Sequence, residues 1–270
     1  MQAINTVMPF VTSVITFIFA GMVFRRYTLR KGFHLLIWGF GLTLYAVAES
    51  MAAINGALGW NPLVFRLWYL CGAILVAAWL GQGTVYLLAR RSRANVILIV
   101  LLLGSLYATF RVFTARLDPT LLPGAQLSGH AIATAGVRIL TPFFNIYGLI
   151  ALAGGAIYST VVYWRRRAFG NQAVGTILIA LGALAPGLGG ALSRFGLTEY
   201  LYLSEFLGTV LMFIGFILAT SPTKESQAPT SVNACTFQSV PGPRESARAP
   251  KGIANCGARS GSLSKPPAVP

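Results

Sequence analysis

The sequence predicts an all-α polytopic membrane protein that folds as a bundle of seven transmembrane helices. Of its 270 residues, 55% are hydrophobic and only 10% are charged, a balance that is not typical of a soluble enzyme. Seven apolar runs are long enough to cross the ~30 Å hydrocarbon core of a bilayer as helices. The chain carries a formal net charge of +15, and its basic residues gather in short loops beside these runs.

The predicted spans follow one another along residues 1–220. We expect them at about residues 8–24, 33–58, 67–89, 95–113, 139–164, 173–192 and 200–220. The first span has no basic segment before it, which is typical of an uncleaved anchor. The second and seventh spans each contain one charged residue, Glu49 and Glu205. A longer polar loop, residues 115–137, separates the fourth span from the fifth, and the sixth span is rich in glycine.

The distribution of basic residues predicts the orientation. The loops after the first, third and fifth spans contain no acidic residue and these ten basic ones: Arg25, Arg26, Arg30, Lys31, Arg90, Arg91, Arg93, Arg165, Arg166 and Arg167. The positive-inside rule therefore places these loops in the cytoplasm of a bacterial-type inner (plasma) membrane, with the N-terminus outside and the C-terminus inside. We expect anionic lipid headgroups as their partners, and we expect no nucleic acid, because the basic residues lie beside membrane spans.

Residues 221–270 form a basic segment rich in Pro, Ser, Gly and Ala. Such a segment buries too little apolar surface to offset the entropy lost on ordering, so it is predicted to be a disordered cytoplasmic tail. It is either a linker to a partner domain or an extension without a function.

The two halves of the chain show similarities that suggest an internal repeat. Residues 67–81 (LWYLCGAILVAAWLG) resemble residues 203–217 (LSEFLGTVLMFIGFI), and aligning Gly72 with Gly208 places spans one to three over spans five to seven. The sequence then predicts a 3+1+3 arrangement of parallel repeats, as in some transporters. The alternative is a chance match, since apolar segments resemble one another readily.

Glu49 and Glu205 are the acidic residues inside apolar runs, and both are predicted in the outer half of the bundle. Glu205 shares a helix face with Gly208 and Gly215, which predicts that it faces protein, because a lipid-facing carboxylate costs several kcal/mol. One hypothesis is an outward-facing site for a cation, a proton or a polar ligand. The alternative is a structural ion pair with one of the arginines expected at the same level, which are Arg66, Arg111, Arg138 and Arg194.

The sixth span contains a candidate helix break. Pro186 removes a backbone donor, and the glycines beside it allow either a bend at a binding site or close packing of a neighbouring helix. The sequence favours close packing with a tolerated kink over a broken helix. The candidate residues are Pro186, Gly187, Gly189 and Gly190.

No motif predicts an enzyme, a metal site or a cofactor. His34 and His130 are expected on opposite sides of the membrane, so they cannot share one metal ion. The three cysteines have no spacing typical of a metal site or a disulfide framework. A retinal Schiff base needs a lysine within the bundle, whereas every lysine lies outside the predicted spans: Lys31, Lys224, Lys251 and Lys265.

Two stretches carry a family resemblance. Residues 66–88 (RLWYLCGAILVAAWLGQGTVYLL) and 189–219 (GGALSRFGLTEYLYLSEFLGTVLMFIGFILA) resemble those of uncharacterised bacterial seven-span proteins. More distantly, they are similar to the seven-helix membrane sensor region of some bacterial histidine kinases. The resemblance covers residues 1–220 and implies an inner-membrane location and signal sensing. No kinase, cyclase or phosphatase domain follows in this sequence.

Two classes of function remain open at this point. The first is a non-catalytic membrane sensor or small-ligand-binding protein with an outward-facing pocket. The second is a small-solute or ion transporter built from a duplicated three-helix unit. Either one implies a separate signalling or transport partner. The lack of an acidic residue in the inner half of the predicted bundle favours the first, because transport needs a polar path to the cytoplasm.

Overall fold

The computed structural model describes residues 2–118, 120, 127–134, 136–165, 170–194 and 199–220, with the side chains of residues 2–5, 163–164, 191–194 and 199–200 excepted. Seven helices in this part are long and apolar enough to cross a membrane, which confirms the predicted all-α seven-helix bundle. The protein is therefore a multi-pass membrane protein. The predicted tail, residues 221–270, lies outside the described residues.

The helices agree with the predicted spans and extend several of them. They are α1 (Gln2–Arg30), α2 (Phe33–Leu58), α3 (Pro62–Trp68), the π-helix η1 (Tyr69–Leu75), α4 (Val76–Leu88), α5 (Arg91–Thr114), the short 3-10 helix η3 (Gly129–Ala131), α6 (Val137–Arg165), α7 (Asn171–Arg194) and α8 (Glu199–Thr220). Helices α3, η1 and α4 together make the third span. It begins earlier than predicted, because Asn61 caps the main-chain N–H groups of Leu63 and Val64 and Pro62 suits the first turn.

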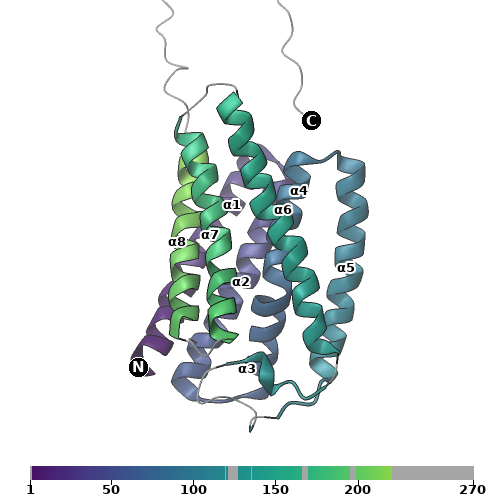
Figure 1. The fold of residues 1–270 in the computed structure, drawn as a ribbon, viewed down its shortest axis with the longest axis vertical. Coiled ribbons are helices and arrows are strands. Elements are labelled where there is room, and N and C mark those ends of the chain that lie inside the picture. The colour runs from purple at the N-terminus through teal and green to yellow at the C-terminus, as the bar shows by residue number, and fades with distance from the viewer. Residues whose placement is uncertain are drawn as a thin grey trace, which may run out of the picture. The chain divides into compact units, whose positions relative to one another are not determined.

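Six of the seven spans form a closed ring (Figure 1). Along the ring α1 packs on α2, α2 on η1 and α4, α4 on α6, α6 on α7, α7 on α8, and α8 on α1 again. We call the end with α3 and the α5–α6 loop the loop end. The opposite end, where α1 finishes at Arg30 and α4 precedes Arg90, is the arginine end.

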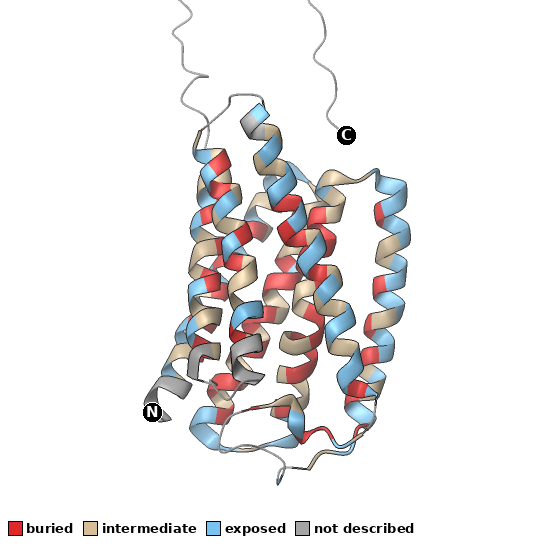
Figure 2. Ribbon diagram, viewed as in Figure 1, coloured by how far each residue is buried: buried red, intermediate tan, exposed pale blue. Residues whose placement is uncertain are grey.

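Helix α5 lies outside this ring, against η1, α4 and α6. Its buried residues lie on one face, and most of its remaining surface is exposed (Figure 2). The buried residues of α5 are Ala94, Leu101, Ser105, Ala108 and Val112. The exposed residues are mainly apolar, as expected for a helix in contact with lipid.

Glycines at intervals of seven bring α7 and α8 into close contact. Gly175, Gly182 and Gly189 of α7 lie against Gly215, Gly208 and Leu201 of α8, in antiparallel register. A seven-residue repeat keeps one helix face against its neighbour when the two helices coil slightly around each other. This α7–α8 seam is the most extensive contact between two helices in the bundle.

Helix α7 is continuous through Pro186, so the broken helix, the alternative that the sequence favoured less, is not present. Proline has no N–H, which leaves the carbonyl of Gly182 without its usual partner four residues ahead. That oxygen lies 2.7 Å from the position that a Cβ would take on Gly208 of α8, and the Pro186 ring packs on the same glycine. The carbonyl of Gly182 therefore faces the backbone of Gly208 at close range. Gly189 packs on Ser204, whereas Gly187 and Gly190 have open space where a Cβ would be.

The π-helix in the third span packs against α6. The side chain of Asn145 donates to the carbonyl of Ala73, which lies inside the π-helix, at 2.8 Å. Just beyond it, Gly148 lies against the backbone of Ala77 and against Gly81 of α4. A π-helix widens the backbone and disturbs the regular hydrogen-bond ladder. Asn145 supplies an amide donor to this widened backbone, and Gly148 lacks a side chain that would keep the two backbones apart.

Candidate ligand-binding site

The two acidic residues of the membrane spans meet inside the bundle. The carboxyl groups of Glu49 on α2 and Glu205 on α8 lie close enough to interact directly, although 156 positions separate them in the sequence. They meet because the ring closes α8 onto α1, next to α2. Both residues lie in the half of the bundle toward the loop end, since α2 finishes there and α8 begins there. We call Glu49 and Glu205 the carboxyl pair.

The two members of the pair differ in burial. Glu49 is only 3% exposed, and its Oε2 is a buried oxygen without a hydrogen-bond partner. Glu205 is half-buried. A charged oxygen without a partner in an apolar interior is strongly disfavoured. The site therefore needs a positive charge or a proton to become stable.

Tyrosine and threonine hydroxyl groups surround the carboxyl pair. The hydroxyl of Tyr45 donates to the main-chain oxygen of Glu205 at 3.1 Å and also contacts Thr209. Tyr202 lies close enough to interact electrostatically with both carboxyl groups, and it is 4% exposed. The sequence analysis missed all three residues. A usable signal existed, because each lies three or four positions from a carboxylate on the same helix face.

Helix α1 contributes further hydroxyl groups but no charge. Ser13 bonds to the hydroxyl of Ser50 at 2.7 Å and donates to the main-chain oxygen of Ala46 at 3.2 Å. Thr12 and Thr16, on the same side of α1, are completely buried and donate to carbonyl groups of their own helix. Helix α1 thus meets α2 through a hydroxyl contact at Ser50, the residue that follows Glu49.

The arginines predicted as ion-pair partners do not reach the pair in the part of the chain that the structure describes. Arg66 donates instead to the carbonyl groups of Phe113 and Ala115, at the C-terminal end of α5. Free carbonyl groups at a helix end carry partial negative charge and attract a cation. Arg138 is exposed in the first turn of α6, and the side chain of Arg194 lies outside the described residues.

The groups that act on the two carboxyl groups include no described cation. The structural ion pair considered from the sequence is therefore not found among the described residues. The ion pair was considered because the arginines and glutamates were expected at the same depth in the membrane. Depth alone does not determine the direction in which a long side chain points. Arg66 is the clear case, since the end of α5 satisfies its guanidinium group.

An apolar layer lies between the carboxyl pair and the arginine end. We call this layer the barrier. Five spans contribute to it, and its buried members besides Tyr45 are Phe19, Ala20, Val23, Leu35, Leu42, Leu80, Leu152, Met212 and Phe216. Phe19 also packs its ring on Phe216, with the centroids 5.4 Å apart. In this conformation the barrier separates the carboxyl pair from the arginine end.

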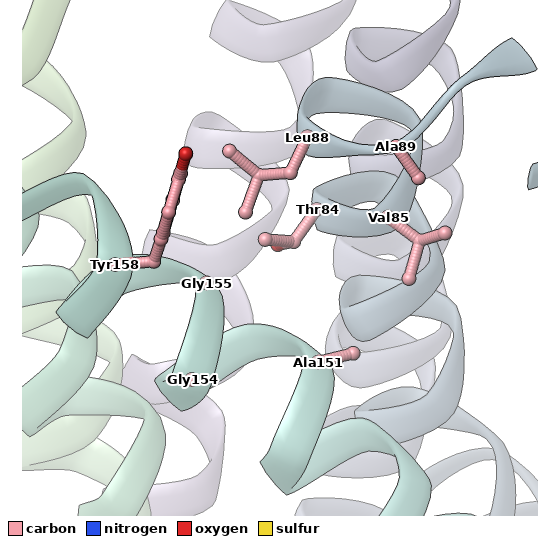
Figure 3. Close-up of a pocket in the computed structure, with 8 residues that line it drawn as sticks. All are labelled: Thr84, Val85, Leu88, Ala89, Ala151, Gly154, Gly155 and Tyr158. Atoms are coloured by element: carbon pink, nitrogen blue, oxygen red, sulfur yellow. The ribbon is translucent and has the colours of Figure 1, made fainter. Parts of the chain in front are cut away.

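A hollow of about 320 Å³ lies elsewhere, between α4 and α6 near the arginine end (Figure 3). Tyr158 of α6 faces Thr84 and Leu88 of α4 across it, and glycines form part of its α6 wall. It contains no residue of the carboxyl pair. The described residues contain no group of three or more His, Cys, Asp and Glu side chains that would hold a metal ion.

Comparisons with protein-family models, with curated proteins and with solved structures find no match.

Proposed function

We propose that this protein is a non-catalytic membrane sensor that binds a small cation at the carboxyl pair, from the outer side of the inner membrane. The observation that carries the proposal is the contact between Glu49 and Glu205 without a cation from the described residues. Ionisable residues inside a bundle mark ligand or ion sites more often than they mark packing. Glu205 is the less buried member of the pair, so we expect a ligand to enter from its side.

The barrier favours a sensor over a transporter. A transporter needs a second path that leads from the site to the cytoplasm. Large apolar side chains of the barrier fill the space between the carboxyl pair and the arginine end. The transporter remains the second candidate because the order of the helices around the ring fits a duplicated three-helix unit. Helices α1, α2 and α3–α4 follow one another around half of it, and α6, α7 and α8 follow in the same sequence around the other half. Duplicated transporters with parallel repeats share this order.

A sensor of this kind needs an output partner. The resemblance to histidine-kinase sensor regions suggests a separate signalling protein at the cytoplasmic side. The arginines of the α1–α2, α4–α5 and α6–α7 loops suit anionic headgroups there. Both the signalling partner and the headgroup contacts require that the arginine end faces the cytoplasm.

The orientation test uses single cysteines. A cysteine placed at Ser92, an exposed position in the first turn of α5, is expected to react with a thiol reagent only after the membrane is made permeable, because the arginines around it favour the cytoplasm. A cysteine at Ser128, in the α5–α6 loop, is the matched control and is expected to react in intact cells. The reverse labelling pattern would overturn the orientation.

The function test measures cation-dependent stability in detergent or nanodiscs. Sodium, potassium and methylammonium chloride are titrated, with choline chloride at equal ionic strength as the reference. A cation that binds only the folded protein stabilises it by about 2.7 kcal/mol at 100 times its Kd. We expect saturable stabilisation by at least one cation, or by protons as the pH is lowered. The stabilisation is expected to disappear in Glu49→Gln and Glu205→Gln.

Asp118→Asn is the control, because Asp118 is a carboxylate in the α5–α6 loop, and Thr120 already hydrogen-bonds to it. Equal responses in the wild type, Glu49→Gln, Glu205→Gln and Asp118→Asn would contradict the proposed site.

Uptake into proteoliposomes distinguishes the sensor from the transporter. A saturable flux that depends on Glu205 would replace the sensor with the transporter.

A further inference from the structure

We propose that the ligand of the carboxyl pair is a proton, which Glu49 carries and donates to Glu205. This inference rests on the proposed function and names its ligand. It makes the loop-end half of the bundle a proton-binding site.

The contact between the two carboxyl groups is the first argument. Two ionised carboxylates repel each other and have only acceptor oxygens, so a hydrogen bond between them requires one proton. Carboxyl groups in direct contact share a proton in this way in the aspartic proteases. A bound metal cation would instead lie between them and would call for several oxygen ligands around it. A shared proton accounts for the direct contact of the two carboxyl groups without any added space.

The unpartnered oxygen of Glu49 is the second and independent argument. If Glu49 were ionised, Oε2 would carry half a negative charge in an apolar interior with no donor beside it. If Glu49 is protonated, Oε2 is the carbonyl oxygen of a neutral acid, and leaving it without a partner costs much less. Glu205 is less buried than Glu49, so a negative charge on it costs less. The burial thus assigns the proton to Glu49 and the charge to Glu205.

The groups that face the pair leave this assignment intact. Tyr45 from α2 and Tyr202 from α8 are the titratable groups that interact with it, and both are neutral phenols at neutral pH. Helix α1 meets α2 beside Glu49 through the hydroxyl group of Ser13, and α7 meets this part of α8 through Gly182 and Pro186. None of these groups competes for the proton. Half-buried Glu205 is therefore the relay between Glu49 and the outer solution.

The test is infrared spectroscopy of the full chain in lipid, where a protonated carboxylic acid absorbs apart from carboxylates and amides. We expect the wild type to show this band at neutral pH. Glu49→Gln is expected to lose it, whereas Glu205→Gln and the control Asp118→Asn are expected to keep it. Raising the external pH is expected to remove the band reversibly and in parallel with a change in tryptophan fluorescence.

Three outcomes would overturn the proton assignment. The first is that the wild type lacks the band. The second is that Glu205→Gln loses the band while Glu49→Gln keeps it. The third is that neither substitution changes the band. Sodium-dependent stability that needs both glutamates, found together with any of these, would leave the proposed function standing with a different ligand. If no cation and no pH change affects stability, the proposed function fails as well.

A second measurement does not depend on variants that fold. Dicyclohexylcarbodiimide is an apolar reagent that reacts with protonated carboxyl groups inside membrane proteins. At neutral pH we expect mass spectrometry to find the adduct on Glu49 in the wild type, and to find less of it as the pH is raised. Labelling of Glu205 alone would contradict the assignment.

Discussion

Replacing Gly148 with alanine is expected to lower the free energy of unfolding by about 3 kcal/mol, at the upper end of the usual cost of overpacking. A Cβ at this position would lie closer than 3.0 Å to the main-chain carbon and oxygen of Ala77. A backbone cannot move aside as a flexible side chain does, so α6 must separate from the third span. The same movement would weaken the bond from Asn145 to Ala73.

Gly154→Ala is the matched control, because Gly154 lies on the same helix and a Cβ there meets nothing within 4 Å. Alanine has the higher helix propensity, by ~1 kcal/mol, so the control is expected to be neutral or slightly stabilising. Reversible unfolding in mixed micelles of increasing denaturing detergent gives both values. A cost below about 1 kcal/mol for Gly148→Ala would show that the backbones are not in contact.

Replacing Gly182 with alanine is expected to have the second largest effect, a loss of about 2–3 kcal/mol. The added Cβ would lie 2.6 Å from the main-chain oxygen of Gly208 and 2.8 Å from the main-chain nitrogen of Met212. Helix α8 must then move away from α7. Because Glu205 lies one turn from Gly208, this substitution is also expected to shift the infrared band of the protonated Glu49 carboxyl group without removing it.

Gly187→Ala is the control in this case, since Gly187 lies on α7 with open space around it. Hydrogen exchange measured for peptides from α7 and α8 should rise in Gly182→Ala and stay unchanged in Gly187→Ala. If both variants exchange like the wild type, the α7–α8 seam does not depend on direct backbone contact.

The seven spans were predictable because each is a local property of the sequence. Hydropathy over some 20 residues identifies a span without any knowledge of its neighbours. The π-helix at Tyr69–Leu75 was not predictable, because its disturbed hydrogen bonds depend on Asn145, more than 70 positions away. The glycine pattern of α7 was visible in the sequence. Its period of seven links Gly175, Gly182 and Gly189, whereas the sequence analysis concentrated on the local cluster around Pro186.

The candidate site was predictable only in part. The small residues beside Glu205 predicted that this residue faces the bundle interior, yet they did not identify what it meets there. Its partner follows from the order of the helices around the ring, which loop lengths and hydropathy leave open. Arg66 illustrates the same limit, because the carbonyl groups at the end of α5 lie within its reach and no local pattern announces them.

Closure of the ring by α8 has a consequence for biosynthesis. Glu49 enters the membrane with α2, but its partner emerges from the ribosome roughly 150 residues later. At about 5–20 residues per second, this delay amounts to roughly 10–30 seconds. During that interval α2 has a carboxyl group in the bilayer and no α8 to receive it. A ribosome stalled before α8 should therefore leave a nascent chain in which α2 is held by the insertion machinery or marked for degradation.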